Sequence, residues 1–554
     1  MAKMNLLQFR CTLLIGVTSL LLFICACSIQ GDEETRAAKK EGSSAVHVNL
    51  GGIYRSPLMN NPSTLDPAYV QDQYGVAVTR QLFNGLVQFG PDLMVLPALA
   101  KTWQVEENGK AYRFFLRPNA RFHNNRPVTI HDVAFSISRL LRITPPPVIL
   151  PHLLKIEGAL AFRNHKTNKV DGLQAINDHV LLIRLNAPHV PFLTALGMYQ
   201  AAIVSKKEVK KSGEKYGQNP IGSGPFRFVS WEKDKSIRLQ RFSDYYDQAA
   251  FLDEIHYRIY PGGQIEDALS DFKKGNLDEM LVYGNIRQEL SSIKDLQWFH
   301  RPSLSLLFYG IRGDHSFLKN PYFRKALSVA IDREKIIKEV AKGQLDPART
   351  ILPPGMPVYH QTDEVLVDDL KVAQGYLKRA LEQETGPIPP VEIVSAIKSS
   401  FAIAELNLIK RCWARLGIPL KIKFITNWKE FKDYIQSDAV QIYRYAWFAD
   451  IPDPDSFLYP LFASDSPVNF MHFKDSQVDK MLLAARGIVD PVKRAEMYQK
   501  IEILVLESSP IIPLLYLSVD RVYQSDVQGI NLTALGAHTM ALHRIWLKGG
   551  PIRK

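Results

Sequence analysis

The stretch VQIYRYAWFADIPDPDSFL, residues 440–458, is the most informative part of this chain of 554 residues. Its first part, 440–448, is largely apolar and rich in β-branched and aromatic residues, a pattern that predicts a strand. Two charges interrupt this pattern, Arg444 inside the run and Asp450 directly after it. Because an unpaired charge in an apolar strand is costly, each of them needs a partner.

Arg444 and Asp450 are too far apart to pair within one extended strand. At roughly 3.3 Å per residue, their Cα atoms would lie about 20 Å apart. A short zwitterionic ligand could bridge this gap, with its amine on Asp450, its carboxylate toward Arg444 and its backbone amides along the strand, as in β-strand addition. The alternative is that both charges meet structural partners elsewhere in the fold.

The N-terminal segment indicates an export signal. Lys3 and Arg10 form a positive flank, and the apolar run 12–24 is short for a membrane span. The run ends in ICAC, residues 24–27, which resembles the bacterial lipobox and identifies Cys27 as the expected site of acylation, palmitate included. The alternative is an ordinary signal peptide. We therefore expect 1–26 to be the signal peptide, 27–45 a flexible tether, and the protein to be exported and lipid-anchored to a bacterial membrane, facing the periplasm or the cell exterior.

Charge, length and cysteine content limit the remaining possibilities. The length predicts about two to four domains, and the formal charge of +12 is spread along the chain, which suits an anionic envelope surface and gives little support to a nucleic-acid partner. Of the four cysteines, Cys412 would be the only one left unmodified in the mature chain, so no intrachain disulfide is expected. Its helical surroundings, 402–416, predict a buried structural thiol.

Short β-like runs alternate with helical patterns from Val46 onward, which predicts an α/β fold. Three helices have Asn or Asp before the first turn and are expected at 322–330, 333–341 and 492–507. Strands are expected at 112–116, 180–185, 226–230, 236–241, 419–425 and 440–448.

No catalytic motif is convincing, so we do not expect an enzyme. The sequence GSGP at 222–225 lacks the spacing of a nucleophile elbow and predicts a turn into a strand. The histidines are scattered, without H-E-x-x-H or C-x-x-C spacing. We therefore expect no metal site and no cofactor.

Residues 447–458 resemble the W-x-x-D-x-x-D/E-P-x-x-F-L block of family 5 solute-binding lipoproteins, the oligopeptide and dipeptide receptors of ABC importers. Other blocks of the chain agree with this family in order and spacing. They are STLDP (63–67), QLFNGL (81–86), PALAKTW (97–103), 112–136, IGSGPF (221–226), 323–333 and SPIIPL (509–514). The resemblance covers essentially the whole chain from Val46 onward.

The resemblance implies a class II periplasmic-binding-protein fold, with two main lobes joined by a hinge and an inserted extra domain. Domain I would be discontinuous, built from 46–83, 200–300 and 518–554. Domain II would be the insert 84–199, and domain III would span 301–517. Ligand would be trapped between domains I and III, and the closed monomer would dock on the permease of an importer that also has ATPase subunits.

The resemblance also implies individual roles within the site. Asp450 would bind the peptide amine, Arg444 the carboxylate of some peptides, and Trp447 and Trp428 would line side-chain pockets. The remaining strand residues would follow the peptide backbone. These are Tyr445, Ala446 and Phe448.

The domain I side of the site would come from a strand at Gln71, Asp72 and Gln73 that sandwiches the peptide. Gln71 stands where the family often has an acidic residue, and no histidine lies near Ala402, where some peptide receptors bind a carboxylate. These departures leave peptide length open.

The expected function is capture of short peptides in the cleft between two lobes and their delivery to a membrane permease. One alternative is a receptor for a non-peptide solute such as a metal chelate, a sugar or haem. Another is a surface lipoprotein acting as an adhesin or a folding helper. A secreted hydrolase lacks any nucleophile constellation. The sequence leaves open the permease partner and whether the anchor lies in the inner or the outer membrane.

Overall fold

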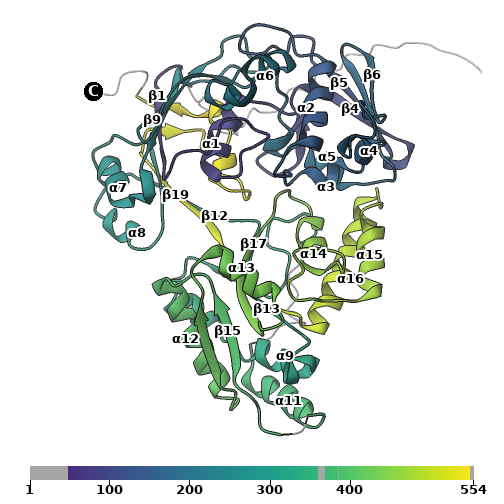
Figure 1. Cartoon of the computed structure of the whole chain (residues 1–554). Coiled ribbons are helices and arrows are strands. Elements are labelled where there is room, and N and C mark those ends of the chain that lie inside the picture. Colours follow the sequence, from purple (N-terminus) through teal and green to yellow (C-terminus); the bar gives the residue numbers. More distant parts are fainter. Residues whose placement is uncertain (1–47, 360–367, 385, 550–554) are drawn as a thin grey trace, which may run out of the picture. The chain divides into compact units, whose positions relative to one another are not determined.

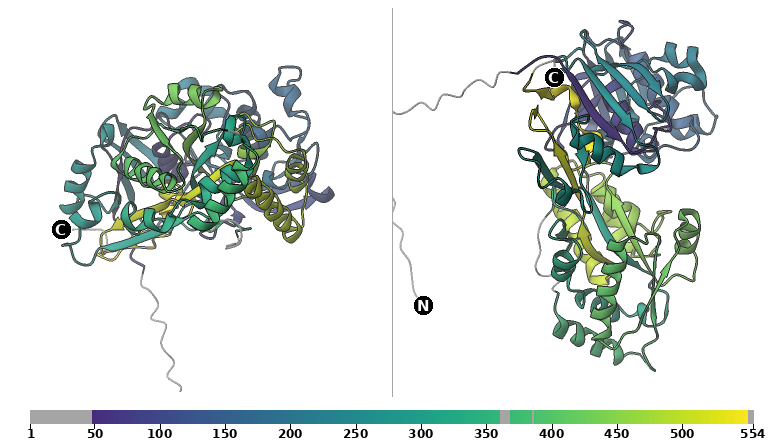
Figure 2. Two further views of the ribbon diagram at one scale, coloured as in Figure 1. Left: turned by 90° about the horizontal axis from the view of Figure 1, so that it is seen from below. Right: turned by 90° about the vertical axis from the view of Figure 1, so that its left-hand side faces the viewer.

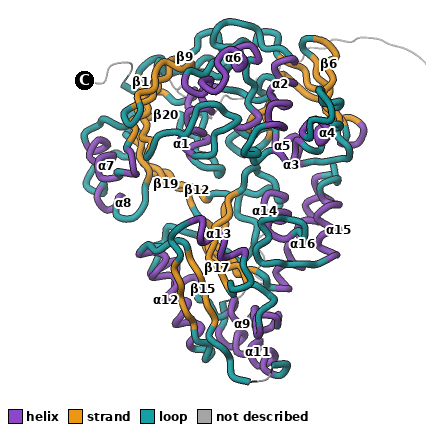
Figure 3. The backbone as a smooth tube through the Cα atoms, viewed as in Figure 1, coloured by secondary structure: helices purple, strands orange, loops and turns teal. Residues whose placement is uncertain are grey.

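The largest sheet is built around the strand that opens the stretch 440–458 (Figures 1 and 3). Its six strands follow the order β14 (Asp346–Pro347), β18 (Ile511–Tyr516), β13 (Ser305–Ile311), β17 (Ile442–Phe448), β15 (Val391–Ser395) and β16 (Leu420–Phe424). β17 is antiparallel to β13 and parallel to β15. The sheet is therefore mixed, with β17 inside it rather than at an edge.

Side chains of this sheet alternate between two apolar layers, as the period of two in a strand requires. Leu307, Tyr309 and Ile311 of β13 pack into one core with the helices α9 (Pro321–Val329), α10 (Arg333–Glu339), α11 (Leu370–Leu381) and α12 (Ser400–Ala414). Leu306 and Phe308 pack into the opposite core with α13 (Trp428–Gln436), α14 (Asp455–Phe462), α15 (Ser476–Ala485) and α16 (Pro491–Ser508). Helices thus cover both faces.

Two four-stranded sheets lie elsewhere in the chain. One has the order β1 (Ile53–Leu58), β10 (Glu254–Ile259), β9 (Ser236–Arg241) and β8 (Phe226–Glu232). The other has the order β4 (Ala100–Glu106), β5 (Ala111–Leu116), β7 (Val180–Arg184) and β6 (Leu173–Asn177). The remaining helices are α1 (Gln73–Leu82), α2 (Ile130–Arg142), α3 (Leu150–Leu153), α4 (Ala159–Arg163), α5 (Pro191–Ala195), α6 (Lys206–Ser212), α7 (Ile265–Lys273) and α8 (Ile286–Glu289).

A three-stranded sheet joins distant parts of the sequence. β19 (Ser518–Tyr523) pairs with both β11 (Glu279–Leu281) and β12 (Gln297–Pro302). Figure 2 shows β19, in yellow, beside the teal segment that contains β12. Two hairpin-like pairs complete the strands, β2 (Val87–Phe89) with β3 (Val95–Pro97) and β20 (Val527–Gln528) with β21 (Trp546–Leu547).

The computed structural model describes residues 48–359, 368–384 and 386–549. The predicted signal peptide 1–26 and the predicted tether 27–45, which includes Cys27, lie outside these residues. Within them, no helix is both long and apolar enough to span a membrane. Each four-stranded sheet and the six-stranded sheet take their strands from one predicted domain, whereas β12 crosses the predicted boundary at 300/301. The exact domain limits stay a prediction.

The local predictions from sequence agree with the structure to within two residues at the strand and helix ends. Asn320, Asp332 and Asp490 each accept a hydrogen bond from a backbone amide in the first turn of α9, α10 and α16, the N-cap contact expected of them. Cys412 is a buried free thiol, as predicted. The GSGP turn leads into β8, and a side chain at Gly222 would come within 1.8 Å of the Leu82 carbonyl oxygen. Close backbone approach therefore explains this glycine.

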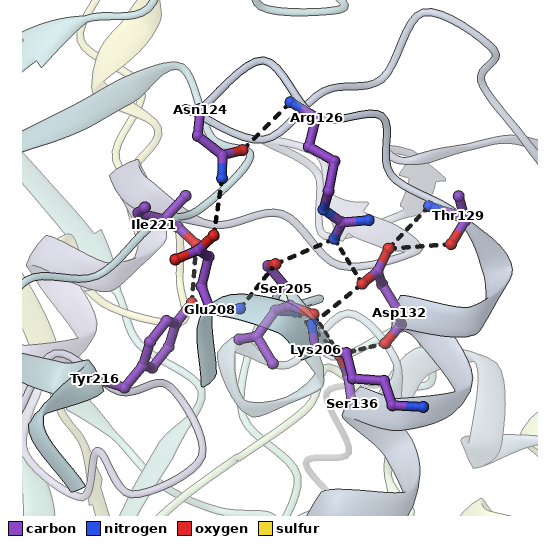
Figure 4. A network of polar contacts seen from close by, with 11 residues as sticks. Asn124, Arg126, Thr129, Asp132, Ser136, Ser205, Lys206, Glu208, Tyr216 and Ile221 are labelled. Carbon is purple, nitrogen blue, oxygen red and sulfur yellow. Dashed lines mark hydrogen bonds and ion pairs between the residues drawn. The ribbon is translucent and has the colours of Figure 1, made fainter. Parts of the chain in front are cut away.

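A buried polar network joins the start of α2 to the start of α6 (Figure 4). Asp132 accepts from the Thr129 backbone amide at 3.2 Å and from the Lys206 backbone amide at 3.1 Å, so one carboxylate caps both helices. Arg126 donates to the same carboxylate at 2.7 Å and to Ser205 Oγ at 3.1 Å. The network fixes the predicted insert 84–199 to the chain that follows it.

We expect Asp132→Ala to lower the free energy of unfolding by about 2–4 kcal/mol, because it leaves Arg126 without its carboxylate partner and the backbone amides of Thr129 and Lys206 without their acceptor. Urea denaturation followed by circular dichroism measures this. Asp171→Ala, which removes an exposed carboxylate with only a 3.9 Å contact to Lys169, is the matched control and should stay within about 0.5 kcal/mol of the parent. Equal effects of the two substitutions would contradict the assignment.

Candidate functional site

Half of one edge of β17 is unpaired. β13 pairs with β17 along its whole length, from Ile442 to Phe448, but β15 pairs only with Ile442–Arg444. Among the described residues, no strand pairs with the segment 445–448 on the β15 side. This segment can therefore form main-chain hydrogen bonds with an extended ligand.

Asp450 follows this open edge, and its carboxylate has no hydrogen-bond or ion-pair partner among the residues described. Its backbone amide donates to Ser456 Oγ at 3.0 Å. The residue is exposed on one side, yet the protein around the carboxyl group raises its pKa to about 6 by desolvation. Desolvation disfavours the charged form of this carboxyl group, and a cation bound next to it would stabilise that form.

The segment after Asp450 is held by buried ion pairs. Asp453 accepts two hydrogen bonds from Arg494, at 2.8 and 2.9 Å, and Asp455 accepts two from Arg486, at 2.7 and 2.9 Å. Bidentate arginine–carboxylate pairs fix geometry as well as supply energy. The acidic residues of the block 447–458 therefore anchor the loop, and Asp450 alone among them is free to act on a ligand.

Asp450 borders a cavity of about 100 Å³. The cavity brings together α1, the residues around the 3₁₀ turn η2 (Tyr199–Ala201), and those around the 3₁₀ turn η6 (Ala537–Thr539). Its polar lining consists of Arg80, Tyr199, Asp450, Thr533, His538 and Thr539. Arg80 and His538 were not predicted from the sequence, because neither stands in a motif with a chemical signature.

The other titratable groups of the cavity have pKa values far from neutrality. Burial, together with nearby Asp450 and Asp72, raises the pKa of Tyr199 to about 12. Burial, together with nearby Arg521 and Arg80, lowers the pKa of His538 to about 4. Between pH 5 and 7, the carboxyl group of Asp450 is thus the group in this lining that changes charge.

Arg444 has a structural partner. Its guanidinium contacts the fully buried Glu405 of α12 with Nη2–Oε2 at 2.8 Å, and the Tyr309 hydroxyl donates to the same carboxylate. This contact is the alternative that the sequence left open for the arginine. A role for Arg444 in binding a ligand carboxylate stays an untested prediction.

The aromatic residues of the predicted site form a stack beside β17. The ring of Trp428 lies 5.9 Å from that of Tyr445 and 5.6 Å from that of Phe431, with interplanar angles of 26° and 24°. Trp428 is 52% exposed and Phe448 is 57% exposed, so both can meet a ligand. Trp447 donates from its indole nitrogen to the Ser456 carbonyl at 2.7 Å, which ties it to the loop that carries Asp450.

Strand alternation divides the predicted β17 residues between two faces. Ala446 packs with the α12 core, on the side where Arg444 meets Glu405, whereas Tyr445 and Trp447 pack with the α13–α16 core. The side chains of Arg444 and Tyr445 consequently do not line one face of the strand. The spacing of residues along the strand does not by itself show on which face each side chain lies.

The prediction of a strand at Gln71, Asp72 and Gln73 was wrong. Asp72 is the N-cap of α1, accepting from the Gly75 amide at 2.7 Å and from the Ser63 hydroxyl at 2.6 Å, and Gln73 is the first helical residue. Local capping chemistry decided the conformation here. Whether these side chains contact ligand stays a prediction.

Metal ligation finds no support in the part of the chain that is described. It contains no group of three or more His, Cys, Asp or Glu side chains placed to hold an ion.

If the Arg444–Glu405 pair is structural, we expect Arg444→Met to lower the free energy of unfolding by about 3–5 kcal/mol, because Glu405 is left buried without its cationic partner and keeps only the Tyr309 hydroxyl. The double variant Arg444→Met/Glu405→Leu should recover most of this loss, since both charges are then gone. Denaturant unfolding of the four proteins in a double-mutant cycle measures the coupling. A double variant as unstable as the single one would contradict a charge-pairing role.

The chain is similar in sequence to known solute-binding proteins. A family model described as bacterial extracellular solute-binding proteins, family 5 Middle, matches residues 95–468. The oligopeptide-binding protein OppA of Bacillus subtilis is 25% identical over 540 residues, which cover 94% of this chain and 97% of the relative. The heme-binding protein A of Haemophilus influenzae is 26% identical over 541 residues, covering 92% and 94%.

The solved structures give the same result for the fold. The periplasmic murein tripeptide binding protein MppA, in its unliganded open form, aligns with a TM-score of 0.78 at 23% identity and covers 90% of this chain and 98% of MppA. The expected periplasmic-binding-protein fold class is thereby confirmed. The family consists of binding proteins, which also confirms the expectation that the chain is not an enzyme. This chain belongs to the bacterial extracellular solute-binding proteins of family 5.

Proposed function

We propose that this chain captures short peptides outside the cytoplasm and delivers them to the permease of an ABC importer. The observation that carries the proposal is the open edge of β17, residues 445–448, which leads directly to the unpaired carboxylate of Asp450. A peptide has a partner for each of these two features. Its backbone amides can pair with the open strand edge, and its terminal ammonium can pair with the carboxylate. The name of the Bacillus subtilis relative OppA supports the same ligand class.

The peptide would lie extended along 445–448 with its amino group on Asp450. Main-chain hydrogen bonds are the same for any side chain, so this contact gives affinity without strong selectivity. Trp428, exposed and stacked on Tyr445, would receive a peptide side chain. In this pose Arg444 keeps Glu405 as its partner, and the peptide carboxylate is bound elsewhere or by solvent.

Export and anchoring complete the proposal. Cys27, at the end of the lipobox-like ICAC segment, would carry the lipid, and the residues up to 45 would tether the receptor to the membrane. The protein would act as a monomer that meets the permease and ATPase subunits of its importer in the ligand-bound state.

A flat aromatic solute is the second candidate ligand. The observation in its favour is the exposed ring of Trp428 in its stack, a surface suited to planar ligands, and one relative of similar identity is named for haem. Such a ligand would not need the carboxylate of Asp450. Native mass spectrometry of the protein purified from cells separates the two candidates, since peptides give a ladder of masses and a single aromatic solute gives one.

The peptide proposal predicts that affinity depends on a free amino terminus. We expect Asp450→Asn to weaken binding of trialanine by about 2–5 kcal/mol, because the ammonium loses its charged partner. N-acetyl-trialanine should bind weakly to the parent and lose little further affinity in the variant. Isothermal titration calorimetry measures all four combinations, and Asp178→Asn, a change at an exposed carboxylate of the insert, is the control. Unchanged trialanine affinity in Asp450→Asn would remove Asp450 from the site.

Binding should also depend on pH in a defined direction. A carboxyl group with a pKa of about 6 is charged above that value and neutral below it. From pH 5 to 7, where the α-amino group of the peptide stays protonated, peptide affinity is therefore expected to rise with pH, by up to about tenfold per pH unit below the pKa of the free protein. Arg80, Tyr199 and His538, which face the same cavity, do not change charge between pH 5 and 7. Calorimetry from pH 5 to 8 measures the profile, and Asp450→Asn should abolish it; a flat profile in the parent would contradict the role of this carboxylate.

A further inference from the structure

Arg80 is a covered arginine without an acidic partner. It lies in the last turn of α1, and its guanidinium donates to one carbonyl, that of Gly197, at 3.3 Å. Burial lowers its pKa to about 10, and no carboxylate contributes to that value, so the side chain remains a cation at neutral pH. A partly buried cation without a carboxylate partner is stabilised when an anion reaches it.

Three other arginines that are largely withdrawn from solvent are compensated. Arg486 and Arg494 each have a carboxylate partner. Arg324 has no carboxylate but donates to four carbonyl oxygens. A single 3.3 Å contact sets Arg80 apart from this pattern.

Arg80 and Asp450 border the same cavity of about 100 Å³ without forming an ion pair with each other. The cavity is smaller than the roughly 300 Å³ or more of a site that encloses a whole ligand. It can therefore hold one end of a ligand, and that end meets a negative group and a positive group at once. The matching chemistry is an ammonium with a carboxylate close to it.

The rest of the described lining offers no second cation for that carboxylate, because burial lowers the pKa of His538 to about 4 and leaves its ring neutral at pH 7. Phe89, Met198 and Leu535 are apolar. The Tyr199 hydroxyl donates to the Val70 carbonyl at 3.1 Å, and the hydroxyl groups of Thr533 and Thr539 bond to each other at 2.8 Å. Arg80 is thus the charged donor of the described lining, in surroundings where a charge-assisted hydrogen bond is strong.

We propose that Arg80 binds the side-chain carboxylate of an acidic first residue in a peptide whose amino group lies on Asp450. This inference rests on the proposed function and adds a preference to it. A first residue is favoured over a later one because the ammonium and the carboxylate must both reach one small cavity. The side chain of glutamate places its carboxylate a few bonds from the amino group, which meets that requirement.

The test compares Glu-Ala-Ala with Gln-Ala-Ala, two peptides that match in size and differ in one charge. We expect the parent protein to bind Glu-Ala-Ala about tenfold tighter or more, as measured by isothermal titration calorimetry. Arg80→Gln should bring the ratio close to one by weakening Glu-Ala-Ala alone. Arg80→Lys should keep part of the preference. Arg227→Gln, which removes an exposed arginine of β8, controls for net charge and should leave the ratio unchanged.

Each outcome has a defined meaning. Equal binding of the two peptides by the parent protein overturns the preference but leaves peptide binding intact, and it requires no variant to fold. A loss of both peptides to the same degree in Arg80→Gln also overturns it, since Arg80 would then support Asp450 or the fold. Free L-alanine binding as tightly as Glu-Ala-Ala would assign Arg80 to an α-carboxylate instead. If the parent binds neither peptide nor trialanine, the proposed function fails and this inference fails with it.

Discussion

The incomplete pairing of β17 is the constraint on which the site depends. A strand inside a sheet normally uses both edges, but β15 stops pairing at Arg444, so 445–448 keep one edge unpaired. β13 on the other side pairs with the same residues along their full length, which holds the open edge in an extended conformation. The sheet thus supplies a fixed template of backbone donors and acceptors, and its cores on both faces keep that template from shifting.

Buried ion pairs explain the composition of the loop after β17. Asp453 and Asp455 would be costly in a buried loop, but each meets an arginine bidentately. Ser456 binds both the Trp447 indole and the Asp450 backbone amide. Four of the block's side chains therefore serve to hold Asp450 in place. The one carboxylate of the loop that remains without a partner is the one we assign to the ligand.

The cavity beside Asp450 links charge to selectivity. Backbone recognition along 445–448 treats all side chains alike, so any preference must come from the ends of the ligand or from its pockets. Arg80 and Trp428 offer two different contacts of this kind, a cation in a small covered cavity and an exposed aromatic ring. Under the proposed function, such a receptor would bind a class of peptides and still rank its members.

The sequence by itself determined the family, the α/β class and the helix caps at Asn320, Asp332 and Asp490, and it singled out Asp450 as a candidate, because these follow from local pattern and short motifs. Only the tertiary structure decided the partners. Glu405 lies 39 residues before Arg444, and Arg80 lies far from Asp450 in sequence, so no spacing could reveal either relation. Asp72 shows the same limit, because a side chain that suited a ligand-facing strand instead caps α1. Motifs indicate which residues a fold requires. Burial and long-range contacts decide which of the charged residues have a partner inside the protein and which can bind a ligand.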